Sequence, residues 1–222
     1  MEVRADLNLT AHLSRTEFNW QPSPLPGVER VLLDRVGGEV AVATSIVRYA
    51  PGARFDAHEH SLGEEFIVLE GVFSDQHGDY ATGTYVRNPP GTRHAPHSDD
   101  GCVIFVKLRQ FDDADLTPVA ANIDFAGPAS EPVALYQYGE EQVSSVCVKA
   151  GERFAFDANF HVRELLVLAG ELDWQQETTR RLGPWSWIRM APGNPLRVNA
   201  VTDCVLFSKT RPIYRAHPRC DH

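Results

Sequence analysis

The sequence lacks several features that would assign it to a common class. No apolar run is long enough to span a bilayer, and the N-terminus lacks the uninterrupted apolar core of a signal peptide. No run of basic residues stands out, and the 222-residue chain carries a net charge of -9, which disfavours nucleic-acid and anionic membrane partners. We therefore expect a soluble, cytoplasmic protein with no nucleic-acid or membrane partner.

Paired cysteines and helical periodicity are also missing. The four cysteines form no Cys-x-x-Cys pair, and we interpret them as reduced, mostly structural thiols: Cys102, Cys147, Cys204 and Cys220. No segment through residue 110 shows a convincing helical period. Short β-rich runs alternate instead with Gly- and Pro-rich turns, and Gly37-Gly38 between two such runs predicts a hairpin. The sequence therefore predicts an all-β protein.

The two halves of the chain repeat each other. Gly52-Ala-Arg-Phe matches Gly151-Glu-Arg-Phe, and the eight residues from Glu64 match the eight from Arg163. Two further matching pairs follow in the same order, at residues 85–91 and 187–193 and at residues 101–108 and 203–210. The separation is 99 residues for the early pairs and 102 for the later ones. An internal duplication explains all four matches.

The repeat predicts two domains. Residues 111–132 are rich in acids, prolines and small residues, which is typical of a linker. We therefore expect an N-terminal arm, a first domain, a linker, a second domain and a tail, at residues 1–20, 21–110, 111–132, 133–215 and 216–222.

Four residues of metal-ligating types are spaced so that they can converge in the first half. His58 and His60 would share one face of a strand, and Glu64 follows a Ser-Leu-Gly break that can turn the chain back. A rigid Pro-Pro-Gly turn at residues 89–91 precedes His94 and could present it to the same point. We predict that these four residues hold one divalent metal ion per chain.

The second half has lost this set of residues. The positions equivalent to the four candidate ligands carry Asp157, Asn159, Arg163 and Leu196. Arg163 would place a permanent positive charge where the cation would lie, and like charges repel. We therefore expect the second domain to be a degenerate, metal-free scaffold.

These residues carry a resemblance to a known family. The first cupin motif is met in full by Gly52, His58, His60, Glu64 and Gly71. The second is met by Gly83, Pro89, Gly91 and His94, with Ser98 in place of its final Asn. The chain thus resembles a bicupin of the RmlC-like cupin superfamily, and residues 40–110 resemble most closely the C-terminal cupin of ChrR-type anti-sigma factors. The resemblance implies two tandem cupin barrels of the jelly-roll (double-stranded β-helix) type, with the metal site in the first, and a homodimer.

The resemblance does not by itself transfer binding of a sigma factor. The sigma-binding module of ChrR is a helical zinc domain with a His-x-x-x-Cys-x-x-Cys signature, and this signature does not occur in the sequence. The resemblance therefore implies a zinc-type cupin site, with a regulatory or stress-related role as one hypothesis.

The ligand types leave the metal and its role open. Zinc held by three histidines and one glutamate would be four-coordinate and closed, whereas iron or manganese would keep two positions open for a small molecule. We favour zinc, with iron or manganese as the alternative. The corresponding functions are a metal-binding regulator and a non-haem dioxygenase acting on a small chelating compound such as a diketone or phenolic. A hydrolase or isomerase has less support, because no partner acid or base is evident.

Other residues are weaker candidates. His97, Tyr85 and Asp100 could line a pocket near the metal, but no catalytic residue can be assigned. Arg87 has a counterpart in Arg189 of the metal-free half, which favours a structural role. The terminal His217, Cys220 and His222 are read as a frayed tail.

Overall fold

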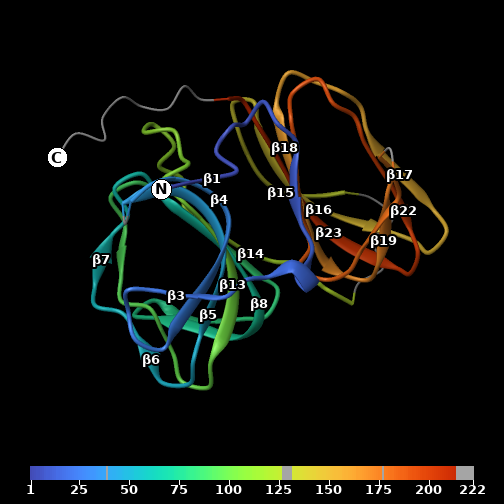
Figure 1. The fold of residues 1–222 in the computed structure, drawn as a ribbon. Coiled ribbons are helices and arrows are strands. Elements are labelled where there is room, and N and C mark those ends of the chain that lie inside the picture. Colours follow the sequence, from blue (N-terminus) through green and yellow to red (C-terminus); the bar gives the residue numbers. More distant parts are fainter. Residues whose placement is uncertain (39, 127–131, 177, 214–222) are drawn as a thin grey trace. The chain divides into compact units, whose positions relative to one another are not determined.

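The computed structural model describes residues 1–38, 40–126, 132–176 and 178–213, and regular structure in these ranges is almost entirely β (Figure 1). The helical exception among them is one short 3-10 turn, η1 (Arg15–Glu17). None of the described residues forms a helix with the length and apolar character needed to cross a membrane. The all-β prediction is confirmed. The predicted tail at residues 216–222 lies outside the described residues.

The chain divides into two compact units. Unit 1 contains residues 1–5 and 16–126, and unit 2 contains residues 6–15 together with the described residues after 126. In Figure 1 unit 1 is mainly blue to green and unit 2 mainly yellow to red. Residues 6–15 belong to unit 2 because strand β2 (Ala11–Leu13) pairs with β21 (Trp187–Met190). The sequence gives no signal for this pairing.

Unit 1 is built from an eleven-stranded sheet and a two-stranded ribbon. The main path of the sheet runs in the order β1 (Glu2–Val3), β4 (Val28–Gly37), β5 (Ala41–Tyr49), β13 (Cys102–Leu108), β8 (Glu64–Asp75), β10 (Thr84–Asn88) and β14 (Val119–Asn122). Short strands join it at the side: β3 (Gln21–Pro22) on β4, β9 (Gly78–Ala81) and β12 (His97–Ser98) on β8, and β6 (Ala53–Arg54) on β12. The ribbon pairs β7 (His58–Glu59) with β11 (Arg93–His94).

The predicted hairpin is confirmed in strands β4 and β5. The two strands pair antiparallel out to Gly37 and Ala41. Gly37 has a φ of 122°, a conformation that residues with a Cβ rarely adopt. Farther along the chain, apolar side chains of β8, β10 and β13 form a buried cluster that includes Phe66, Val68, Phe73, Val86 and Ile104. This cluster is the apolar core on which the metal-ligand loops rest.

Unit 2 consists of a six-stranded and a four-stranded sheet. The first has the order β15 (Val133–Tyr138), β16 (Glu141–Val148), β23 (Cys204–Arg211), β18 (Val162–Ala169), β21 and β2. The second has the order β17 (Arg153–Phe156), β22 (Leu196–Ala200), β19 (Leu172–Trp174) and β20 (Arg180–Leu182). The sequence repeat is visible here, because the order β16-β23-β18-β21 corresponds to β5-β13-β8-β10 in unit 1.

Candidate metal centre

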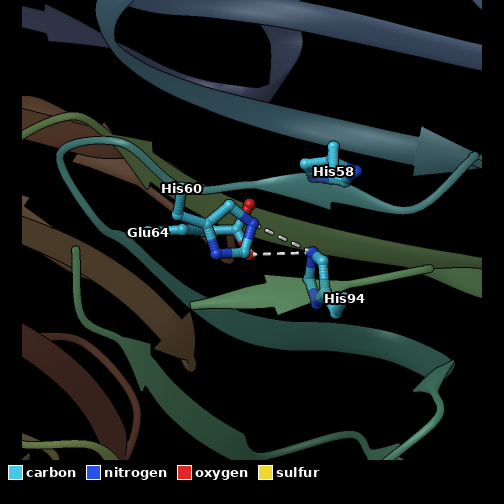
Figure 2. Close-up of side chains that lie close together, drawn as sticks. All are labelled: His58, His60, Glu64 and His94. Carbon is cyan, nitrogen blue, oxygen red and sulfur yellow. Dashed lines mark hydrogen bonds and ion pairs between the residues drawn. The ribbon is translucent and has the colours of Figure 1, made fainter. Parts of the chain in front are cut away.

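The four predicted ligands lie on segments that the sheet brings together (Figure 2). His58 of β7 and His94 of β11 face each other in the antiparallel ribbon. His60 follows β7, and Glu64 opens β8. Gly63 makes the turn between them with a φ of 76°, and a Cβ there would lie 2.4 Å from the ring of Phe111. The break that the sequence shows before Glu64 is therefore a tight turn that requires glycine.

The side chains converge within a short radius. Among the described residues, one ligand atom from each of His58, His60, Glu64 and His94 lies within 4.8 Å of all the others. His60 Nε2 and His94 Nε2 are 3.1 Å apart, and Glu64 Oε1 lies 3.6 Å and 3.5 Å from them, respectively. His60, Glu64 and His94 are buried, and His58 is half-buried.

The outer nitrogen of each ring has a partner that fixes the tautomer. His58 Nδ1 is 3.0 Å from the carbonyl of Asp56, and His94 Nδ1 is 3.1 Å from Asp75 Oδ2; both oxygens can only accept. His60 Nδ1 is 3.2 Å from Thr92 Oγ1, whose hydroxyl donates to the carbonyl of Pro89. Because each Nδ1 must then be the donor, each Nε2 presents a lone pair.

A divalent cation satisfies this arrangement. Lone pairs on His60 Nε2 and His94 Nε2 repel each other at 3.1 Å unless a positive charge lies between them. For metal–ligand bonds of about 2.1 Å, neighbouring donor atoms are roughly 3.0 to 3.4 Å apart in octahedral or tetrahedral geometry. The observed separations of 3.1 to 3.6 Å fit such an ion, although they do not distinguish zinc from iron, manganese or nickel.

Burial also sets the protonation states of the donors. Removal from water, followed by the neighbouring imidazoles of His94 and His58, lowers the pKa of His60 to about 3. Burial likewise lowers the pKa of His94, against the opposing effect of Asp75. Burial raises the pKa of Glu64 to about 7. Two imidazoles are therefore ready to bind at neutral pH, and Glu64 is the carboxylate that gains most from a nearby cation.

Asp75 is a part of the centre that the sequence did not reveal. It is buried at the end of β8, where the hairpin with β9 brings it against His94. Its second oxygen accepts from the His77 backbone at 2.7 Å and the Tyr80 hydroxyl at 3.3 Å. Asp75 is thus held from two sides while it orients the imidazole. A lone Asp has no distinctive spacing, so no motif could have found it.

A cavity of about 480 Å³ adjoins the donor cluster within unit 1. All four donors contribute to its lining. The opposite wall consists of alternating side chains of three neighbouring strands: Val28 of β4, Ser45, Val47 and Tyr49 of β5, and Ile104, Val106 and Leu108 of β13. The centre therefore lines a largely apolar cavity of the size that small-molecule sites have.

Tyr49 lines the cavity and is another residue that sequence reasoning missed. It is buried, and its ring contacts Phe55 and Phe73. Burial, with the charge of Glu64 as the next cause, raises the pKa of Tyr49 well above its usual value. Its hydroxyl therefore stays protonated and can donate a hydrogen bond. Alternation along β5 could have indicated this face, but nothing in the sequence paired β5 with the metal ligands.

The predicted pocket residues lie elsewhere. Tyr85, His97 and Asp100 are not among the described residues that line the cavity. Tyr85 is fully buried, and its hydroxyl donates to Glu65 at 2.9 Å. His97 belongs to β12, which pairs with β6 and β8, and Asp100 is exposed in the bend that follows. Arg87 forms buried ion pairs with Glu65 and Asp115.

The equivalent region of unit 2 is filled. Leu196, which stands where His94 does, is buried in an apolar cluster with Val146, Leu165 and Met190. The guanidinium of Arg163 lies 3.9 Å from the centre of the Phe156 ring. Arg163 also donates to Thr210 Oγ1 at 3.1 Å. A cation and packed apolar side chains thus occupy the region of the second unit that corresponds to the centre.

Comparisons with solved structures support the fold over nearly the whole chain. Protein YlbA of E. coli aligns with a TM-score of 0.71 at 12% identity, covering 95% of both chains. The nickel(II) complex of the pirin YhhW of Escherichia coli aligns with a TM-score of 0.70 at 13% identity, covering 92% of this chain and 99% of the pirin. A salicylate 1,2-dioxygenase mutant of Pseudoaminobacter salicylatoxidans aligns with a TM-score of 0.60 at 12% identity, covering 90% and 75%.

Sequence comparison finds a similarity to a known family over part of the chain. None of the curated proteins matches the sequence significantly. Residues 10–112, which contain all four donors, match the family described as the ChrR Cupin-like domain. The predicted all-β cupin fold is confirmed, and residues 10–112 are similar to the ChrR Cupin-like domain.

Proposed function

We propose that this protein is a metal-dependent cupin enzyme that uses dioxygen to oxidise a small chelating compound. The observation that carries the proposal is the cavity of about 480 Å³ beside the three histidines and Glu64. A metal ion that only stabilises a fold is closed off by its four ligands and needs no adjoining space. Here the donors line an adjoining cavity, which suits an ion that must accept a further ligand.

Iron(II) or manganese(II) held by these donors would be a Lewis acid with positions open for the compound and for dioxygen. The chain's own residues contribute the rest. The outer partners of His58, His60 and His94 keep the Nε2 atoms turned inward. Apolar side chains of β5 and β13 exclude water from the space in front of the donors. Tyr49 supplies a hydroxyl that can orient an oxygen atom of the bound compound.

A second candidate is a zinc-binding regulator of the ChrR type. The match of residues 10–112 to the ChrR cupin-like family favours it. In that case zinc would fill the donor cluster, and the cavity would bind a signal compound. Binding of a sigma factor and formation of a homodimer remain predictions. We rank this candidate second, because a zinc ion closed by four ligands would not itself bind a compound in the cavity.

The decisive experiment measures the metal and the reaction together. The full chain is purified anaerobically from unsupplemented native cells, and the metal is counted per chain. We expect about one iron or manganese, and oxygen uptake when small diketones, phenols or keto acids are added. About one zinc per chain, with no oxygen uptake after reconstitution with iron or manganese, would favour the regulator instead.

A further inference from the structure

The cavity collects positive charge in an acidic protein. Three arginines line it, Arg30, Arg35 and Arg109, and its acidic lining residues are Glu59 and Glu64. Glu64 belongs to the donor cluster, and Glu59 pairs with Arg93 at 2.9 Å. Because the whole chain has a net charge of -9, this local excess of cations runs against the overall balance. A cation on the donors would increase it, so the field inside the cavity favours an anion.

Arg109 is fixed next to the metal-ligand loop. It follows β13 and has a φ of 60°, a left-handed conformation that is rare for residues other than glycine and asparagine. Its backbone N–H donates to the carbonyl of Gly63 at 2.9 Å. One terminal nitrogen of its guanidinium donates to the hydroxyl of Ser61. Both partners lie in the loop between His60 and Glu64, so the side chain is tied to the segment that positions the donors.

The Nε–H group of Arg109 lacks a hydrogen-bond acceptor among the described residues. It is also buried, and a buried donor without an acceptor is costly. A carboxylate oxygen is the acceptor that a guanidinium binds most strongly, through two parallel hydrogen bonds. The contact with Ser61 uses one terminal nitrogen, so the other N–H groups of the guanidinium can donate to a carboxylate.

We propose that the cavity binds a small organic carboxylate, with Arg109 receiving the carboxylate and the metal centre binding a neighbouring oxygen atom. The inference rests on the proposed function, since it names the class of compound on which the centre acts. The apolar wall formed by Val47, Ile104, Val106 and Leu108 requires the rest of the compound to be apolar. Arg109 is a binding residue in this proposal and takes no part in the oxidation.

The test compares the binding of two small compounds that have nearly the same shape, only one of which is charged. Phenylglyoxylate carries a carboxylate beside a ketone. The uncharged diketone in which a methyl group replaces the charged oxygen has nearly the same shape. Binding of each to the manganese-loaded full chain is measured by calorimetry without dioxygen, because manganese keeps positions open for the compound and the absence of dioxygen prevents oxidation. We expect phenylglyoxylate to bind about tenfold or more tightly than the diketone, from the charge-assisted hydrogen bonds.

Variants of Arg109 separate its charge from its place in the fold. Asn tolerates the left-handed backbone, so Arg109→Asn removes the guanidinium without added strain and should abolish the preference for phenylglyoxylate. Arg109→Lys should keep part of it. The control is Arg54→Asn. Arg54 is exposed, pairs with Asp99 and does not line the cavity, so this variant should keep the preference for phenylglyoxylate. Manganese content checks that the variants fold.

The outcomes distinguish the two proposals. Equal binding of both probes, no binding of either, or an unchanged preference in Arg109→Asn would overturn the carboxylate inference. Oxygen uptake with the uncharged diketone would then still support the enzyme. Conversely, Arg109-dependent binding of phenylglyoxylate, without oxygen uptake for any metal, would leave the carboxylate site standing and refute the oxidation.

Discussion

Two adjacent residues on one strand show what the two units share and where they differ. Glu65 of β8 lies opposite Arg87 and Lys107 on the flanking strands. Glu164 of β18 lies opposite Arg189 and Lys209 in the same way. The preceding residue differs, because it is Glu64 in unit 1 and Arg163 in unit 2. Since successive side chains of a strand point to opposite faces, one face is kept in both units and the other has diverged.

The shared face is a buried layer of charges. Tyr85 donates to Glu65 at 2.9 Å, and Trp187, at the equivalent position, donates to Glu164 at 3.1 Å. The arginine and the lysine opposite each glutamate are fully buried. This layer therefore supports the fold whether or not the other face binds metal. The comparison shows that the metal centre lies on one face of a sheet, while the opposite face supports the fold.

The largest effect is expected from breaking the shared layer. In the structure Arg87 pairs with Glu65 at 2.8 Å and with Asp115 at 2.6 Å. The substitution Arg87→Met would remove this cation and leave the two carboxylates buried. We expect unit 1 to lose about 3 to 5 kcal/mol of stability, measured by urea unfolding. The control Arg93→Met breaks the exposed pair with Glu59 and should cost less than about 1 kcal/mol. Similar losses in both variants would refute a supporting role for the layer.

Changing the divergent face should remove metal and spare the fold. Glu64→Gln keeps the size of the side chain but removes the only anionic donor of the cluster. We expect metal affinity to fall by a factor on the order of a hundred or more, with stability of the metal-free protein maintained. The matched control is Glu59→Gln, which alters the neighbouring exposed carboxylate outside the cluster. Full metal content in Glu64→Gln would contradict the site assignment.

A smaller loss is expected from the residue behind the ligands. Asp75→Asn would remove the carboxylate that accepts from His94 Nδ1 at 3.1 Å, so the imidazole would lose its fixed tautomer. Metal affinity should drop about 10- to 100-fold, as measured by competition with a chelator. Asp79→Asn, on the exposed part of the same hairpin, should have no effect. An unchanged affinity in Asp75→Asn would mean that the backbone alone orients His94.

The sequence predicted four residues whose side chains converge in the structure, because their geometry is local. His58, His60 and Glu64 lie within seven residues, and a fixed turn precedes His94. The residues that it missed are set by tertiary structure. Asp75 meets His94 only through the β8–β9 hairpin, and Tyr49 faces the donors only after the strands have closed around the cavity.

Tyr85 lies on the face of the sheet that points away from the metal ligands. Tyr85 contacts Glu65, and Glu64 and Glu65 must point to opposite faces of β8 because strands alternate. A residue that contacts Glu65 therefore points away from the metal ligands. The sequence did not show which strands pair, so its pocket candidates were chosen by nearness along the chain, and none of them lines the cavity.

The mildest effect is a dependence of metal affinity on pH that originates in Glu64. Without a bound cation, burial raises the pKa of Glu64 to about 7 and lowers that of His60 to about 3. At pH 6 the His60 imidazole is already neutral, while Glu64 is mostly protonated and must release a proton when metal binds. Affinity should therefore fall as pH drops below about 7, by up to tenfold per pH unit.

Calorimetry in buffers with different ionisation enthalpies measures this proton directly. About one proton should be released per metal bound at pH 6, and markedly fewer at pH 8. Asp75→Asn should release a similar number at lower affinity, because Glu64 is intact. Equal proton release at both pH values would assign the competing proton to another group. The equivalent face of unit 2 has a permanently charged arginine instead of this titratable carboxylate, so raising the pH cannot prepare it for a cation.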